Sequence, residues 1–263
     1  MVGAAPFTQH GLSLQAEPLT DAHGPLRLVW LHGWGQTRQS LRPLANALLR
    51  HGEAWLVDLP GHGSVPPPTA PCTPAAMASL LGAWLATLPP CPTLIIGHSM
   101  GFRVALHAAQ QQLPELQGIV ALGGAGVPRQ LSPRTQLRRW AIARLMRLGH
   151  WAKPLAGEGL LNHLRRRFGS RDYLSCPADL RAMFVAVVSD DTTPLLPHLT
   201  TPALLLYGAE DEETPPDVGR TLARLLPRAT LEILPHLNHY TILTHGQHVV
   251  QQRLQGWLKT LGA

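Results

Sequence analysis

Short apolar runs alternate with amphipathic stretches along most of the chain. The runs are three to six residues long and almost continuously apolar, which is typical of strands buried on both faces of a parallel sheet. The stretches between them carry apolar residues three and four positions apart, which predicts helices. The expected strands are residues 26–31, 54–57, 94–96, 119–122, 203–207 and 231–234, with an edge strand at 11–17. The expected helices are residues 41–50, 74–88, 104–112, 222–226 and 248–261.

Residues 127–198 interrupt this alternation, and the strand pattern resumes at residue 203. The expected helices of the interruption are residues 136–150, 160–168 and 178–188. Strands and helices that alternate in this way specify an α/β fold, with a mostly parallel sheet and helices on both of its faces. We therefore expect a core domain of residues 1–126 and 199–263, with residues 127–198 inserted as a helical lid.

A serine lies at the junction between one of these strands and the next helix. The sequence Gly97-His98-Ser99-Met100-Gly101 directly follows the apolar run of residues 94–96. In a sharp strand-to-helix turn, the serine hydroxyl projects above the sheet on a strained backbone, and the flanking glycines avoid collisions with the neighbouring strand and helix. This context predicts that Ser99 is a nucleophile.

A serine hydroxyl is a weak nucleophile at neutral pH, so it needs a histidine to take its proton and a carboxylate to orient that histidine. Groups at the carboxyl ends of parallel strands converge on one crevice. Asp211 follows one expected strand and His239 follows the next, in the chain order that this arrangement requires. Neighbouring residues compete for both roles: Glu210, Glu212 and Glu213 for the acid, and His236 for the base.

The chain resembles the α/β-hydrolase fold over nearly its whole length. The matching motifs are His32-Gly33-Trp34-Gly35, Asp58-Leu59-Pro60-Gly61-His62-Gly63, Gly97-His98-Ser99-Met100-Gly101, Gly208-x-x-Asp211-x-x-x-Pro215 and His239. The resemblance implies a serine carboxylesterase that needs no cofactor. We expect it to cleave a small-molecule ester with a small to medium acyl chain through an acyl-enzyme. It implies that Ser99 is the nucleophile, His239 the general base and acid, and Asp211 the orienting acid. It also implies an oxyanion hole formed by the backbone N–H groups of Trp34 and Met100.

The residues around these motifs add expectations of their own. Those expected near the bound substrate are His32, Gly33, His98 and Phe102. We expect His32 to order its loop rather than transfer protons, and His98 to pack rather than act as the base. Phe102 stands where many relatives have a second glycine, and there it narrows the space behind the serine. Asn238 stands where the family usually has glycine before its histidine, and asparagine tolerates the left-handed conformation.

Positive charge is concentrated in the predicted lid. Residues 127–200 hold eleven arginines and Lys153 against five acidic residues, a net charge of +7. The whole chain has a net charge of +6, so the rest of the chain is nearly neutral. These lid residues can form a basic face that only contacts solvent. Alternatively, their positive field can attract an anionic partner. The pimeloyl-carrier methyl esterases of biotin synthesis share the His-Gly-Trp-Gly loop and hold an acidic acyl carrier protein with lid arginines. By this partial resemblance, the candidate contacts are Arg138, Arg139, Arg165 and Arg166.

Other features favour or disfavour further classes of protein. The histidines at 236, 239, 245 and 248 fit no standard metal site, and no recognition element for nucleic acid accompanies the basic residues, so we predict neither ligand. The sequence shows no secretory signal or membrane-spanning run, and its three scattered cysteines favour a reduced, cytoplasmic protein. We expect a monomer or a dimer. Hydrolysis of a thioester, a lactone or a C–C bond stays open, as does a non-catalytic ligand receptor of the same fold.

Overall fold

The computed structural model describes residues 6–20, 24–69, 72–129, 144 and 176–262. The chain divides into two compact units, one of Met1–Arg129 with Val185–Ala263 and one of Gln130–Phe184. The first unit holds the sheet and the candidate site. The assignment of residues 127–198 to a lid domain stays a prediction.

The described strands form one eight-stranded sheet, in the order β1-β2-β4-β3-β5-β6-β7-β8. The strands are β1 (Phe7–Gln9), β2 (Leu12–Pro18), β3 (Arg27–Leu31), β4 (Glu53–Asp58), β5 (Thr93–His98), β6 (Leu116–Leu122), β7 (Ala203–Gly208) and β8 (Ala229–Leu234). In this order, neighbouring strands from β4 to β8 are parallel to each other. β2 is antiparallel to both of its neighbours, β1 and β4. All residues of β3, β5 and β7 are buried, as their continuous apolar character indicated. The mostly parallel sheet predicted from the sequence is confirmed.

The amino-terminal strands correct one expectation, which placed a single edge strand at residues 11–17. β2 pairs with β1 on one side and β4 on the other, so β1 is the edge of the sheet. His10 and Gly11 join β1 to β2 with φ values of 50° and 76°. Two consecutive positive values are typical of a two-residue hairpin turn, whose twist matches that of the strands. The three residues of β1 are too few to show a periodic pattern.

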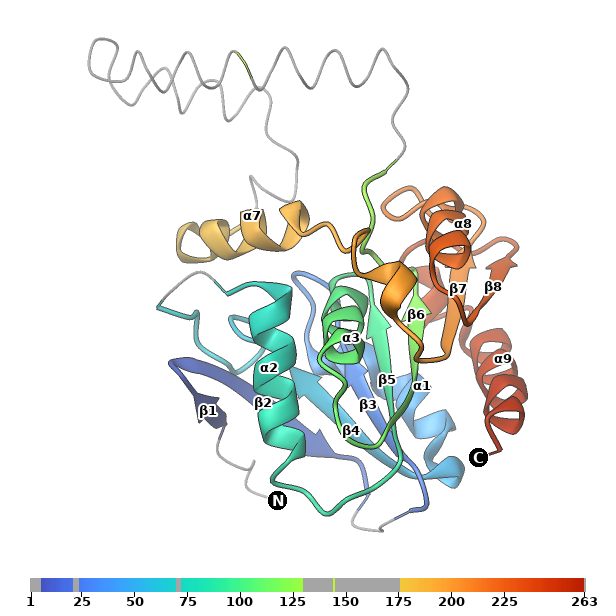
Figure 1. Cartoon of the computed structure of the whole chain (residues 1–263), viewed down its shortest axis with the longest axis horizontal. Coiled ribbons are helices and arrows are strands. Elements are labelled where there is room, and N and C mark those ends of the chain that lie inside the picture. The colour runs from blue at the N-terminus through green and yellow to red at the C-terminus, as the bar shows by residue number, and fades with distance from the viewer. Residues whose placement is uncertain (1–5, 21–23, 70–71, 130–143, 145–175, 263) are drawn as a thin grey trace. The chain divides into compact units, whose positions relative to one another are not determined.

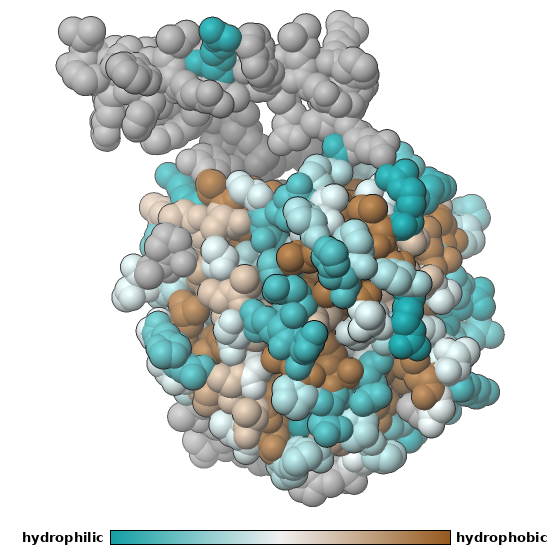
Figure 2. All heavy atoms as spheres, in the orientation of Figure 1, coloured by the Kyte–Doolittle hydropathy of each residue, from teal (hydrophilic) through white to brown (hydrophobic). Residues whose placement is uncertain are grey.

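Helices cover both faces of this sheet (Figure 1). The helices of the first unit's body are α1 (Arg42–Ala47), α2 (Pro74–Leu85), α3 (Met100–Gln110), α8 (Pro216–Leu225) and α9 (Gln247–Thr260). α2 and α3 pack together on one face, and α1 and α9 pack together on the other. Apolar side chains of α1 and α9 join alternate residues of the strands in one buried cluster. Figure 2 shows hydrophilic and hydrophobic side chains intermixed on the face of this unit turned to the viewer.

Short 3-10 turns complete the described elements, at Arg38–Leu41, Leu49–His51, Ala178–Leu180, Leu196–His198 and Thr241–Leu243. α7 (Arg181–Ser189) confirms the helix expected at residues 178–188. The backbone N–H and the hydroxyl of Thr192 both donate to the carbonyl of Gly126, at 3.0 Å each, where the chain leaves and re-enters the first unit. The helices expected at 136–150 and 160–168 lie outside the described residues, as do Arg138, Arg139, Arg165 and Arg166.

Candidate active site

Ser99 occupies the turn between β5 and α3. Its φ is +49° with ψ at −110°, a strained conformation for a residue with a side chain. A Cβ added to Gly97 would overlap the backbone of Gly101, and a Cβ on Gly101 would overlap the carbonyl of Leu31. Ser99 is half-buried while its neighbours on both sides are buried, so the tight turn presents this one side chain to the surroundings.

His239 and Asp211 form a buried pair at the same end of the sheet. Nδ1 of His239 lies 2.8 Å from Oδ2 of Asp211, and each residue is at least 94% buried. The other carboxylate oxygen of Asp211 accepts the backbone N–H groups of Glu213 and Thr214, at 2.9 and 2.8 Å. Because both carboxylate oxygens have donors, the Asp211 side chain is held in the orientation that meets the histidine.

The loops that carry this pair are joined to each other. The backbone N–H of Ala209 donates to the carbonyl of Leu234 at 2.8 Å, and that of Glu210 donates to Leu237 at 2.9 Å. These bonds hold the segment after β7 against the segment after β8. The spacing between Asp211 and His239 is therefore set by backbone contacts as well as by their own hydrogen bond.

The competing residues lie at the surface. The His236 side chain is 92% exposed, and its Nδ1 lies 3.7 Å from the exposed carboxylate of Glu210. His236, with φ at +58°, is the left-handed residue of this loop, whereas Asn238 does not use the left-handed conformation that it tolerates. Asn238 instead accepts the N–H groups of Tyr240 and Thr241 through its side-chain oxygen, at 3.0 and 2.9 Å. Its side chain thus orders the turn around His239.

The loop of residues 32–36 lies directly over Ser99. A Cβ added to Gly33 would stand 3.3 Å from the Cβ of Ser99 and 2.8 Å from Nδ1 of His98. Trp34 follows Gly33, and Met100 follows Ser99 as the first residue of α3. The N–H groups of a helix's first turn have no acceptor within the helix. The two residues predicted to supply oxyanion donors therefore directly follow Gly33 and Ser99, which lie close together.

His32 holds this loop in place. Its Nε2 accepts the backbone N–H of Leu59 at 3.1 Å, and its Nδ1 donates to the carbonyl of Gly33 at 2.8 Å. Burial lowers the pKa of His32 to about 3, so the ring is neutral at physiological pH. The neutral ring with its proton on Nδ1 satisfies both bonds. These contacts are those of a residue that orders the loop.

His98 connects the loop over Ser99 to the segment that carries His239. Its Nε2 donates to the backbone carbonyl of His239 at 2.9 Å, and its Nδ1 lies 2.9 Å from Oε1 of Gln36. The same Gln36 oxygen accepts the N–H of Gly33 at 3.0 Å. Burial, and then the neighbouring His239 ring with its centroid 4.6 Å away, lower the pKa of His98 to about 3. His98 packs inside the protein, and its expected contact with substrate stays a prediction.

Phe102, also expected beside the substrate, is fully buried. A Cβ added to Gly124 would approach its ring to 2.6 Å, so the phenyl group fills the space under the loop after β6. Its contact with substrate stays a prediction as well.

Two residues of this site escaped the sequence analysis. The backbone N–H of Thr214 donates to Asp211, and the side-chain oxygen of Gln36 accepts the N–H of Gly33. For Thr214 a signal exists, because a hydroxyl residue three positions after an aspartate favours a local side-chain-to-backbone turn. Nothing in the sequence around Gln36 indicates its role, which depends on the approach of two distant segments.

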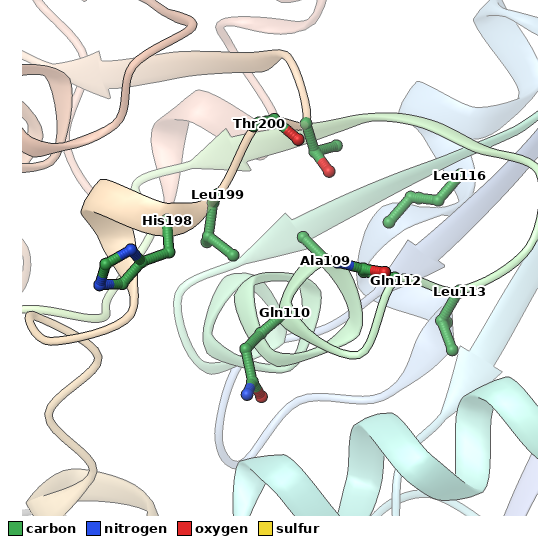
Figure 3. A pocket seen from close by; sticks show the side chains of 9 residues that line it. Ala109, Gln110, Gln112, Leu113, Leu116, His198, Leu199 and Thr200 are labelled. Carbon is green, nitrogen blue, oxygen red and sulfur yellow. The ribbon is translucent and has the colours of Figure 1, made fainter.

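A cavity of about 420 Å³ lies at the opposite end of the sheet from Ser99. Figure 3 shows it between the carboxyl end of α3, with Ala109 and Gln112, and the segment around His198 and Thr200. Leu116, which begins β6, also lines it, whereas the residues described above follow the carboxyl ends of the strands. The cavity is therefore separate from the candidate active site.

Two features are absent from the residues that the structure describes. Among them, no group of three His, Cys, Asp or Glu side chains is arranged to hold a metal ion. No helix in this part of the chain is long and apolar enough to cross a membrane.

The fold and the site define the class of protein. A mostly parallel sheet, with a serine on the strained turn after an inner strand and a buried Asp–His pair beside it, is the arrangement of an α/β-type hydrolase. Residues 28–252 match the model of the alpha/beta hydrolase family, and the chain belongs to that family.

Curated relatives and solved structures agree with this assignment. The chain is 29% identical over 248 residues to a pimeloyl-[acyl-carrier protein] methyl ester esterase of Chromobacterium violaceum, covering 88% of this chain and 94% of that protein. It is 30% identical to the protein of that name from Xylella fastidiosa, covering 91% and 97%. An esterase from Exiguobacterium antarcticum superposes with a TM-score of 0.73 at 18% identity, covering 98% and 100%. A hydrolase from Pseudomonas aeruginosa gives 0.71 at 23% identity, covering 96% of each chain.

Proposed function

We propose that this protein cleaves a carboxylic ester through an acyl-enzyme, with Ser99 as nucleophile, His239 as general base and acid, and Asp211 as orienting acid. The observation that carries the proposal is the 2.8 Å bond between His239 and Asp211, buried at the same end of the sheet as the half-buried Ser99. A carboxylate on Nδ1 keeps the Nε2 lone pair available to take a proton.

The reaction then follows from these roles. His239 removes the hydroxyl proton of Ser99 as its oxygen attacks the ester carbonyl, and the oxyanion is stabilised by the N–H groups of Trp34 and Met100. The tetrahedral intermediate collapses, the C–O bond to the alcohol breaks, and His239 gives its proton to the leaving alcohol. Water, activated by His239, attacks the acyl-enzyme in the same way and releases the carboxylic acid and Ser99.

For the substrate, we propose a methyl ester of an acyl chain attached to an acyl carrier protein. The support comes from the curated relatives named pimeloyl-[acyl-carrier protein] methyl ester esterase, whose alignments cover 86% or more of this chain. The basic residues of the predicted lid agree in sign with an acidic carrier protein. The proposed contacts, on these grounds, are Arg138, Arg139, Arg165 and Arg166.

The test compares two substrates on the same variants. Chromogenic p-nitrophenyl esters of graded chain length report on the chemistry, and a methyl ester linked to an acyl carrier protein reports on the partner. Ser99→Ala is expected to abolish hydrolysis of both, and undiminished activity refutes the mechanism. His239→Ala is expected to cost orders of magnitude, whereas the matched change at the exposed neighbour, His236→Ala, is expected to cost little; the reverse result moves the base to His236.

The partner is tested by charge reversal in the lid. Arg138→Glu with Arg139→Glu is expected to reduce kcat/KM for the carrier-linked ester and to leave that for p-nitrophenyl esters nearly unchanged. The reduction should be larger at low ionic strength, because long-range steering is screened by salt. Equal effects on both substrates contradict the carrier as partner while leaving the ester chemistry intact.

A further inference from the structure

The hydroxyl of Thr214 lies at the centre of the Asp211–His239 pair. Its Oγ1 is 3.0 Å from Oδ2 of Asp211, 3.1 Å from Nδ1 of His239 and 2.7 Å from the carbonyl oxygen of Gly123. The residue is 92% buried. A hydroxyl has one proton to donate and two lone pairs to accept with, so Thr214 donates to only one of these three neighbours.

The proton positions follow from the chemistry of the neighbours. The Gly123 carbonyl and the Asp211 carboxylate are acceptors, so Nδ1 of His239 carries the proton that it gives to Asp211 at 2.8 Å. The Thr214 hydroxyl has its shortest contact with the Gly123 carbonyl and donates its proton there. Oγ1 and Oδ2 of Asp211, 3.0 Å apart, are then two acceptors that share the Nδ1–H of His239. A lone pair of Oγ1 then faces the Nδ1–H of His239, which has two acceptors.

We propose that Thr214 is a positioning residue for the base, acting as a second acceptor for the Nδ1–H of His239; the inference rests on the proposed function of His239. The Gly123 carbonyl, whose residue is tied by its own N–H to Leu206 at 2.8 Å, anchors the Thr214 hydroxyl to the end of the sheet. The histidine ring is thus oriented from two sides, by Asp211 and by Thr214.

The second acceptor also affects the charged form of the base. When His239 takes the serine proton, the negative end of the Thr214 hydroxyl dipole faces the imidazolium and stabilises it. The titratable groups that face the ring among the described residues are Asp211, the buried neutral His98 and Tyr240, whose ring lies edge-on at 5.3 Å. None of them replaces the hydroxyl as a neutral acceptor on Nδ1.

The experiment compares Thr214→Val, which keeps the shape of the side chain but removes the hydroxyl, with Thr214→Ser, which keeps it. Thr93→Val is the matched control, because Thr93 is also a buried threonine whose hydroxyl donates to a backbone carbonyl, at 2.8 Å, but it lies at the start of β5. For a p-nitrophenyl ester, kcat and KM are measured at neutral pH, and kcat/KM is followed from pH 5 to 9.

Thr214→Val is expected to lower kcat roughly 3- to 10-fold with KM nearly unchanged, the size of one lost hydrogen bond. The acidic limb of its pH profile is expected to move to lower pH, because the imidazolium has lost an acceptor. Thr214→Ser and Thr93→Val are expected to keep the wild-type kcat and profile. If Thr214→Val does not fold, Thr214→Ala supplies the same comparison with a smaller side chain.

Three outcomes overturn the inference. An unchanged kcat and profile in Thr214→Val would mean that the hydroxyl has only a structural role. A shift of the acidic limb to higher pH would mean that the hydroxyl donates to Asp211 instead of accepting from His239. Failure of Thr214→Ser to restore kcat would mean that packing, not the hydroxyl, matters. Failure of the proposed function is distinguishable, because Ser99→Ala would then retain the wild-type activity.

Discussion

Gly123 provides a direct test of how closely the Asp211–His239 pair must be held. The residue directly follows β6 and has φ at +53°. A Cβ added to it would lie 2.9 Å from Oδ2 of Asp211, 3.1 Å from Nδ1 of His239 and 3.3 Å from Oγ1 of Thr214. Gly123→Ala therefore places a methyl group against all three members of the hydrogen-bonded cluster at once.

The size of the effect follows from these distances. Ordinary van der Waals contact begins near 3.4 Å, so Asp211 and the new methyl group must separate by about 0.5 Å. A misplacement of about 1 Å at a reacting group costs roughly 100-fold in rate. We expect kcat to fall roughly 10- to 100-fold. The left-handed backbone adds a stability cost of about 1–2 kcal/mol for any residue with a Cβ.

Gly11→Ala separates the two effects. Gly11 has φ at +76° with no atom within 4 Å of an added Cβ, so its substitution introduces left-handed strain without crowding. Both variants should be less stable in urea unfolding, Gly11→Ala by about 1–2 kcal/mol and Gly123→Ala by more because of its crowding. Only Gly123→Ala should lose kcat on p-nitrophenyl esters. A Gly123→Ala enzyme with wild-type kcat, or a Gly11→Ala enzyme with an equal loss, would refute the reasoning.

Two further predictions concern stability. The folded pKa values of His32 and His98, near 3, lie below the ordinary value of 6.5, so the unfolded chain binds protons that the folded one does not between these limits. As the pH is lowered below 6.5, the free energy of unfolding should decrease by about 1.4 kcal/mol per pH unit for each histidine. Urea unfolding at pH 7.5 and 5.5 measures this decrease. An equally large decrease in His98→Asn contradicts the explanation. Glu53→Leu should cost about 3–5 kcal/mol, because it leaves Arg27, bonded to Glu53 at 2.5 Å, as an unpaired buried charge. Adding Arg27→Met should recover most of that loss in the same measurement, and no recovery would refute the explanation.

Much of this protein can be predicted from local pattern. Runs of apolar residues predicted the six parallel strands β3 to β8, and the glycines around Ser99 predicted the strained turn, because both depend on neighbours within a few residues. Asp211 and His239 were chosen for their places after two strands, a rule that follows from parallel strands sharing one carboxyl end. β2 was also predicted as a strand, but it was given the place at the sheet edge that β1 occupies.

Other features depend on distances between residues far apart in the chain. That His239 rather than His236 meets a buried carboxylate is a matter of which side chain the loop turns inward. The contact of His98 with the carbonyl of His239 joins residues 141 positions apart, and that of Thr214 with Gly123 joins residues 91 apart.

The sequence by itself therefore determined the order of strands and helices and the chemical types available at the strand ends. Periodicity and steric fit act over a few residues, so the chain records them locally. Only the tertiary structure decided which of those groups share hydrogen bonds, which are buried and neutral, and that a threonine hydroxyl stands beside the predicted base. Hydrogen bonding and burial are properties of three-dimensional packing, because the partners come from segments that fold together only when the whole sheet has formed.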